Sequence, residues 1–295
     1  MAATDPAPGL PQAELVADRG AFELRGWISG AEAEGPSILC LHETAGSAEL
    51  WRPLATALSG RARLVAYDRR GWGRSGAPED YRRTTIEEQA LDVEAVIEAL
   101  GAGPPIVCGA GLGAVVALEL SVHRAELVSA ALLIEPPLLA LVPEATATIS
   151  ADVEAIRRTT AAIGTRLDGD AGPREAAAAG ARAALELYLG GGLGALGLGA
   201  ERIPGALADP DQVSPYALFA EVAAISGWTL PLGELPSLGP PVAVVIADST
   251  PPFVRRAAES LTVRLPGADM RELPAAGLPQ LDCPDELAEV LLELA

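Results

Sequence analysis

Short apolar runs rich in β-branched residues alternate with longer helical patterns along most of this 295-residue chain. This alternation predicts βα units and a mostly parallel sheet. The predicted strands are residues 22–28, 37–41, 64–67, 106–108, 130–134, 242–247 and 269–273. The predicted helices in the same rhythm are residues 50–58, 85–100, 112–122, 253–261 and 284–294.

The rhythm stops between residues 138 and 235, where no stretch has the pattern of a good strand. Helical patterns cover residues 151–163, 174–189 and about 215–225. The glycine-rich residues 190–199 permit left-handed conformations, and they fit either a hinge or an irregular packed loop. The predicted division is therefore an α/β core, a helical cap and the rest of the core, in residues 1–137, 138–235 and 236–295.

The charge of the chain limits its partners. A formal net charge of −19 repels nucleic-acid phosphates and anionic lipid headgroups, so we expect neither nucleic acid nor a membrane surface as a partner. Apolar residues make up 49% of the chain, enough for a sizeable core, yet no apolar stretch is long enough to predict a transmembrane helix. The first residues lack the basic and apolar regions of a signal peptide and indicate a loose tail.

Composition also excludes several cofactors. All 21 basic residues are arginines, which rules out Schiff-base chemistry, pyridoxal phosphate and a P-loop lysine. Cys40, Cys108 and Cys283 lack C-x-x-C spacing, which fits a reducing cytoplasm, and the first two lie in apolar runs where cysteine is a small buried side chain. Two histidines and three scattered cysteines do not have metal-ligand spacing, and the glycines of 109–113 do not match G-x-G-x-x-G. We therefore expect neither a metal nor another cofactor.

The run Cys-Gly-Ala-Gly-Leu-Gly at 108–113 has the form of the sharp strand-to-helix turn that presents a nucleophile. The pattern of that turn is G-x-S-x-G, and its middle position is Gly111. Glycine has no side chain, so it cannot attack a substrate or form an acyl-enzyme.

Four segments in this order and at these spacings resemble the α/β-hydrolase superfamily, and they are residues 41–47, 67–76, 109–113 and 133–137. The resemblance covers roughly residues 22–139 and 241–294. It implies an α/β-hydrolase fold, in which an eight-stranded, mostly parallel sheet has helices on both faces and a helical cap over its carboxyl edge.

The family's catalytic triad follows the order serine, acid, histidine. The resemblance places the acid nearest Thr250, with Asp248 close but shifted, and the histidine at Leu278. The chain has only two histidines, His42 and His123, and both precede the cap. All three triad positions are therefore vacant, and the sequence predicts a triad-less member that is not a serine hydrolase.

Other parts of the expected site remain. The resemblance places backbone donors of an oxyanion hole at Leu112 and at Glu43 or Thr44. Glu43 is a candidate acid or base at the pocket rim, or a solvated loop residue, and Glu135 is the better-placed candidate, or a structural partner for an N–H or an arginine. His42 resembles the family's brace of the oxyanion loop. Three tryptophans could either line the pocket or pack in the core, and they are Trp51, Trp72 and Trp228.

Three hypotheses about function follow. The first is a cofactor-free, non-hydrolytic enzyme that uses Glu135 or Glu43 to promote cyclisation, isomerisation or elimination of an apolar small molecule. Natural-product biosynthesis is a setting suggested by analogy with other triad-less relatives. The alternatives are a non-catalytic ligand-binding protein and a hydrolase that uses a carboxylate-activated water. The sequence leaves the substrate and the oligomeric state open.

Overall fold

The computed structural model describes residues 12–79, 81–167, 172–189, 203, 214, 216–265 and 267–295. An eight-stranded sheet forms the centre, in the order β1-β2-β4-β3-β5-β6-β7-β8. The strands are β1 Gln12–Asp18, β2 Glu23–Ser29, β3 Ser37–Leu41, β4 Arg63–Tyr67, β5 Ile106–Ala110, β6 Ala130–Ile134, β7 Val242–Ala247 and β8 Asp269–Leu273. The pairs β1–β2 and β2–β4 are antiparallel and all others are parallel. The predicted α/β-hydrolase fold is confirmed.

Helices cover both faces of the sheet, because successive side chains of each strand point to opposite faces. In β3, Leu39 and Leu41 join the core beneath one set of helices, and Ile38 and Cys40 join the core on the other face. The first face carries α2 Ile86–Leu100, α3 Leu112–His123 and α7 Pro252–Arg264; the second carries α1 Arg52–Ala57 and α9 Pro284–Glu293. The predicted burial of Cys40 and Cys108 is confirmed, and these two residues lie opposite each other in paired strands.

Helix α2 begins where its sequence places a cap. Thr85 accepts a hydrogen bond from the backbone N–H of Glu88, whose side chain accepts the N–H of Thr85 in return. This capping box satisfies two N–H groups that a helix start otherwise leaves free. At the other end Gly101 takes a left-handed conformation with φ 58° and stops the helix.

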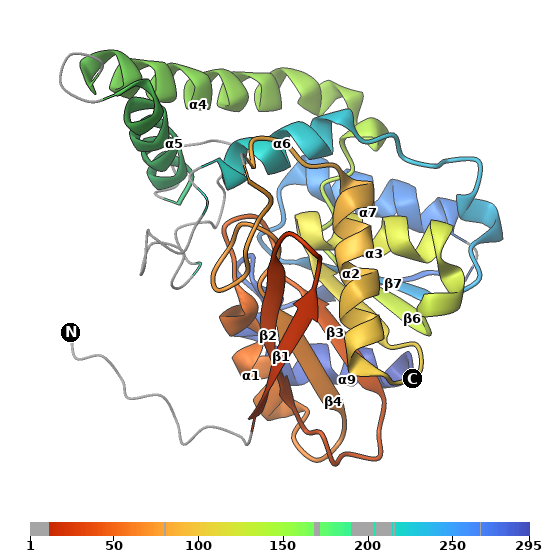
Figure 1. Cartoon of the computed structure of the whole chain (residues 1–295). Helices are drawn as coiled ribbons and strands as arrows, with labels where there is room; N and C mark the ends of the chain where they lie inside the picture. Colours follow the sequence, from red (N-terminus) through yellow and green to blue (C-terminus); the bar gives the residue numbers. More distant parts are fainter. Residues whose placement is uncertain are drawn as a thin grey trace, which may run out of the picture.

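The described part of residues 138–235 contains helices and no strand. Its helices are α4 Thr146–Leu167, α5 Pro173–Leu189 and α6 Ala217–Gly227. In Figure 1, α4 and α5 form a hairpin that projects beyond the core, and α6 lies between this hairpin and the sheet. The glycine-rich residues 190–199 lie outside the described residues. The division at 137/138 and 235/236 stays a prediction.

Shorter elements complete the chain. The helix α8 Pro279–Asp282 precedes α9, and the 3₁₀ turns are η1 Ala48–Trp51, η2 Ala125–Leu127, η3 Leu139–Leu141, η4 Pro143–Ala145 and η7 Leu235–Ser237. Within the described ranges, no helix combines the length and the apolar character needed to span a bilayer.

Candidate active site

The predicted strand-to-helix turn joins β5 to α3. Gly111 lies in it with φ 53° and ψ −120°, a conformation that favours glycine, and its N–H donates to the carbonyl of Ile134 at 2.9 Å. A Cβ on Gly113 would lie 2.3 Å from the carbonyl oxygen of Leu41, so this glycine lets α3 approach β3. Leu112 begins α3, so its N–H has no partner within the helix and is directed at the turn.

Glu43 covers this turn. A Cβ on Gly111 would have the Cβ of Glu43 as its nearest neighbour, at 2.8 Å. The side chain of Glu43 therefore lies where a nucleophile at position 111 would begin. Glu43 and Gly111 both line the same cavity.

His42 holds the loop that carries Glu43. Its Nε2 accepts the backbone N–H of Arg69 at 2.8 Å, so Nδ1 carries the ring proton and donates to the carbonyl of Glu43 at 2.7 Å. Burial, with the charge of Arg69, lowers the pKa of His42 well below its ordinary value. The ring is therefore neutral, and its expected role as the brace of this loop is supported by both bonds.

Glu135 follows the end of β6, at the same edge of the sheet. Its φ of 47° is unusual for a residue with a side chain. Its Oε1 accepts hydrogen bonds from the hydroxyl of Thr250 and from the N–H of Ala247 at 3.4 Å. Burial raises the pKa of Glu135, whereas these two bonds and the charge of Arg255 act in the opposite direction. Both bonds use Oε1, so Oε2 is the oxygen available to a bound molecule.

Burial, and then the charge of Glu135, raise the pKa of Glu43 from 4.5 to about 8. A long hydrogen bond from Gln280 Nε2, at 3.4 and 3.5 Å from the two carboxyl oxygens, and the charge of Arg69 act in the opposite direction. Glu43 is therefore protonated at neutral pH. The two carboxyl groups differ in what surrounds them, because only Glu135 has a hydroxyl donor that stabilises its charged form.

The cavity that Glu43 and Glu135 both line has a volume of about 150 Å³. A cavity of about this volume holds a benzene ring. Its floor comes from the carboxyl edge of the sheet, and Tyr188, Ile203, Val222 and Ile225 line it from the cap. The remaining lining residues are Glu43, Thr44, Gly111, Leu112, Ile134, Glu135, Pro137, Leu139, Pro251, Phe253, Val254, Gly277 and Leu278. Most of these side chains are apolar.

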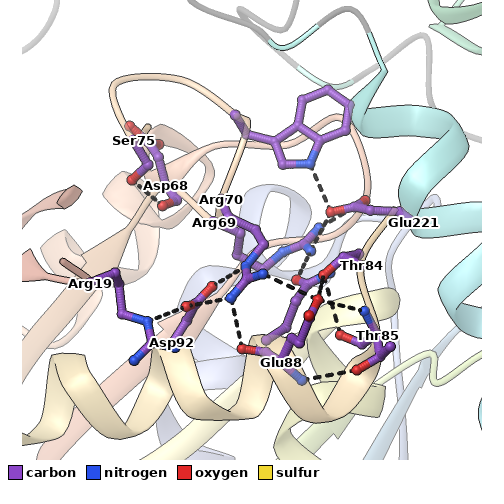
Figure 2. Close-up of polar contacts among 12 residues, drawn as sticks. Arg19, Asp68, Arg69, Arg70, Ser75, Thr84, Thr85, Glu88, Asp92 and Glu221 are labelled. Carbon is purple, nitrogen blue, oxygen red and sulfur yellow. Dashed lines mark hydrogen bonds and ion pairs between the residues drawn. The ribbon is translucent and has the colours of Figure 1, made fainter. Parts of the chain in front are cut away.

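A buried arginine connects the loop that carries Glu43 to helix α6. Arg69 donates from Nε to the carbonyl of His42 at 2.8 Å and from Nη1 to Gln89 at 2.6 Å. Its guanidinium also pairs with Glu221 of α6 at 2.5 and 3.2 Å, and Trp72 donates to the same carboxylate at 2.8 Å. Figure 2 shows Arg69, which follows β4, and Glu221, on α6, facing each other.

A second network lies beside it. Arg70 makes two hydrogen bonds to Asp92 of α2, at 2.5 and 2.8 Å, and Arg19 donates to the same carboxylate at 2.8 Å (Figure 2). These bonds fix the turn after β4 against α2. The arginine-rich segment 69–75 is therefore a structural turn, and its buried arginines, Arg69 and Arg70, are paired with protein carboxylates.

A family comparison agrees with this architecture. Residues 38–290 match the model of the Alpha/beta hydrolase family. The chain belongs to the alpha/beta hydrolase family. One relative of this alpha/beta hydrolase is the putative carbamate hydrolase RutD of Azorhizobium caulinodans, 35% identical over 92 residues, which are 31% of this chain and 34% of that protein. Another is 3-oxoadipate enol-lactonase 1 of Acinetobacter baylyi, 30% identical over 111 residues, 38% of this chain and 40% of that protein. The matched stretches thus span less than half of either relative.

Solved structures resemble this alpha/beta hydrolase over nearly its full length. A thermophilic esterase from Thermogutta terrifontis has a TM-score of 0.67 at 18% identity, with 96% of this chain and 97% of that chain covered. The enol-lactonase from Burkholderia xenovorans LB400 has a TM-score of 0.65 at 22% identity, with 95% and 98% covered. At such identities the likeness establishes the fold.

The structure brings most of the predicted site residues of this alpha/beta hydrolase together. The cavity is lined by Glu43, Thr44, Gly111, Leu112, Glu135 and Leu278. Thr250 lies behind Glu135 and holds its carboxylate. Asp248 is exposed, so the shifted acid of the sequence pattern does not reach the cavity lining. His123 is not among the lining residues either, and it contacts Glu119 on the surface of α3.

The prediction that Trp51 walls the pocket is wrong. Trp51 is fully buried in the core between the sheet and the helices α1 and α9, because η1 turns its large ring toward that apolar layer. Trp72 and Trp228 are also absent from the cavity lining, and their indole N–H groups donate to Glu221 and Glu119.

Sequence reasoning missed Gln280 and Tyr188. Gln280 is fully buried at the start of α8 and contacts Glu43. Tyr188 reaches the cavity from the last turn of α5. Tyr188 belongs to no motif, and its one available signal was a lone aromatic residue at the end of an alanine-rich helix. The signal for Gln280 was its place two residues after Leu278, where the resemblance puts the histidine. Among the described residues, no group of three or more His, Cys, Asp or Glu side chains could hold a metal ion.

Proposed function

We propose that this protein hydrolyses a small, largely apolar ester or lactone with a carboxylate-activated water and without an acyl-enzyme. The observation that carries the proposal is the pair of unlike carboxyls in one cavity. Glu43 is protonated at neutral pH, and Glu135 accepts two hydrogen bonds that favour its ionised form. Two titratable groups with such different surroundings form an acid–base pair.

Hydrolysis needs only the two carboxyl groups, the N–H of Leu112 and a water molecule. Glu135 takes a proton from water, and the water oxygen bonds to the carbonyl carbon to give a tetrahedral oxyanion. The O–H of Glu43 and the N–H of Leu112 donate hydrogen bonds to that oxyanion. Glu135 then gives its proton to the leaving oxygen as the carbon–oxygen bond breaks, so the enzyme returns to its starting state. General base catalysis of this kind contributes about 10²- to 10⁴-fold in rate.

Membership of the alpha/beta hydrolase family, and relatives named as hydrolases, support hydrolysis more than the non-hydrolytic alternative. In a second candidate function, Glu135 removes a proton from a carbon atom of the substrate and returns it to another atom, while Glu43 acts as the acid. This chemistry would give isomerisation, elimination or cyclisation. The predominantly apolar lining favours this candidate, since it limits the water that competes for a reactive intermediate.

One experiment separates these functions. A panel of neutral esters, lactones and ketones is incubated with the protein in H₂¹⁸O and, separately, in D₂O, and products are read by mass spectrometry. One atom of ¹⁸O in an acid product supports hydrolysis, and deuterium on carbon without ¹⁸O supports the second candidate. Neither label, with ligand binding retained in a thermal-shift assay, indicates a binding protein.

Variants test the assignment of the base. Glu135→Gln is expected to lower turnover at least about 100-fold while thermal-shift binding persists. Asp248→Asn is the matched control, because Asp248 is an exposed carboxyl at the end of β7 and outside the cavity lining. Equal turnover by Glu135→Gln and the wild type would overturn the role of Glu135.

A further inference from the structure

Tyr188 is the polar side chain that the cap places in the cavity beside Glu43. It lies in the last turn of α5, is 9% exposed, and lines the cavity. Burial raises the pKa of Tyr188, and the charge of Glu43, which lines the same cavity, is the next cause. Glu221 also raises the pKa of Tyr188 and Arg69 lowers it. Tyr188 therefore keeps its proton and is a hydrogen-bond donor at all working pH values.

Glu43 supplies a second O–H to the same cavity. The groups that face it are Glu135, Gln280, Arg69 and Tyr188. Gln280 donates weakly to both carboxyl oxygens, and its own Oε1 is buried without a hydrogen-bond partner. These long bonds orient the carboxyl group of Glu43, but they do not stabilise its ionised form enough to deprotonate it. A carboxylic acid that stays neutral in an apolar site can donate a hydrogen bond to a substrate oxygen.

We propose that Tyr188 is a catalytic residue that, with Glu43, forms an oxyanion hole made of two side-chain hydroxyl groups, one from the cap and one from the core. The inference rests on the proposed function and deepens it, because it defines what the site selects. The site selects a ring-sized apolar compound whose oxygen gains negative charge, such as the carbonyl oxygen of an ester or ketone on its way to an oxyanion. Leu112, whose backbone N–H starts α3, lines the same cavity.

This arrangement predicts a ligand class that can be tested without a known substrate. A phenolate carries its charge on one oxygen attached to a ring, and the cavity of about 150 Å³ accommodates one ring. Two neutral O–H donors favour the phenolate over the neutral phenol, because a charged acceptor forms the stronger hydrogen bond. Burial and the charge of Glu135 oppose the phenolate, as they oppose ionisation of Glu43, so phenolate binding requires the two donors to outweigh them. Benzyl alcohol has a ring of the same size but lacks the charge.

The probe is 4-nitrophenol, whose phenolate has a visible absorption band that its phenol lacks. It is titrated with the full chain at a pH below the pKa of the free phenol, with benzyl alcohol as the neutral comparison. The expected result is a phenolate spectrum for the bound probe and weakening of its binding as the pH rises through about 8, where Glu43 ionises. A bound probe with the spectrum of the neutral phenol would overturn the proposal.

Three variants identify the donors. Tyr188→Phe is expected to weaken phenolate binding about 10- to 100-fold, the effect of losing one hydrogen bond to a charged group. Glu43→Gln keeps an N–H donor, so binding falls less and its loss near pH 8 disappears. Tyr81→Phe is the matched control, since Tyr81 is a buried tyrosine outside the cavity lining, and it is expected to bind like the wild type. Wild-type binding by Tyr188→Phe would refute the role of Tyr188.

The outcome also separates this inference from the proposed function. Phenolate binding that depends on Tyr188, with no ¹⁸O incorporation on any substrate, supports the oxyanion hole and contradicts hydrolysis. Turnover that depends on Glu135, with phenolate binding unaffected by Tyr188→Phe, supports hydrolysis and contradicts the oxyanion hole.

Discussion

The Cβ of Glu43 lies 2.8 Å from the point that a Cβ on Gly111 would occupy. Carbon atoms at van der Waals contact are about 3.5–4.0 Å apart, so the two side chains cannot both be present without a shift. The glycine in the strand-to-helix turn and the glutamate above it therefore depend on each other. Restoring a serine at 111 does not by itself recreate a serine hydrolase, and Leu278 stands where the resemblance places the histidine.

We predict that Gly111→Ser destabilises the protein by about 1–3 kcal/mol, because the new Cβ overpacks against Glu43 and a positive φ is strained for serine. Urea unfolding measures the effect. Glu43→Gly removes the opposing Cβ, so the double variant is expected to lose less stability than the sum of the two single variants. Additive losses would show that the two residues are not coupled.

The fold was largely readable from the sequence because the central strands are continuous apolar runs at regular spacing. Strand β1 was missed, since its sequence QAELVAD mixes polar and apolar residues and it is held by pairing along its whole length with β2. For the site, Glu43 and Glu135 were predictable because both follow strands at the carboxyl edge. Tyr188 and Gln280 were not, because tertiary packing, which no local pattern encodes, brings Tyr188 to the cavity and Gln280 to Glu43.

Glu43 makes the stability of the protein depend on pH. Its pKa of about 8 in the folded state exceeds its ordinary value of 4.5, so between these values the unfolded chain releases a proton that the folded chain keeps. The free energy of unfolding therefore falls as the pH rises from about 4.5 to 8 and levels off above that, by about 5 kcal/mol at most.

Glu43→Gln tests this pH dependence, because glutamine cannot ionise. We expect it to be more stable than the wild type at pH 8.5 and to gain much less at pH 5, as measured by urea unfolding at both values. Glu98→Gln, at an exposed glutamate of α2, is the control and is expected to show no such difference. A Glu43→Gln effect that is equal at both pH values would mean that Glu43 is ionised at pH 5.

Thr250 lowers the pKa of Glu135, the proposed general base. Its hydroxyl donates to Glu135, which favours the ionised carboxylate. Thr250→Val removes that donor, so the pKa of Glu135 rises and the acidic limb of the pH–rate profile moves to higher pH. The full profile of kcat/KM measures the shift. Thr262→Val, at a hydroxyl that bonds within α7, is expected to leave the limb in place; an equal shift in both variants would count against the assignment.

Replacement of Glu221 by a neutral residue is expected to lower the stability of the protein strongly. Its carboxylate is fully buried and pairs with Arg69, which is 1% exposed. Glu221→Gln leaves the guanidinium without its counter-charge, and such a break costs about 3–5 kcal/mol. Thermal and urea unfolding measure this loss. The exposed pair Arg52–Glu49 provides the comparison, because Glu49→Gln is expected to change stability by less than about 1 kcal/mol. Similar losses in both variants would contradict the buried pairing.

The guanidinium of Arg69 also restrains helix α6. Arg69 is bonded at once to the carbonyl of His42, to α2 through Gln89, and to α6 through Glu221. Raising α6 away from the sheet would separate a buried ion pair and pull on the loop that carries Glu43. Helix α6 therefore behaves as a fixed wall that moves with the core, so the width of the cavity on that side is set by the ion pair and not by the ligand.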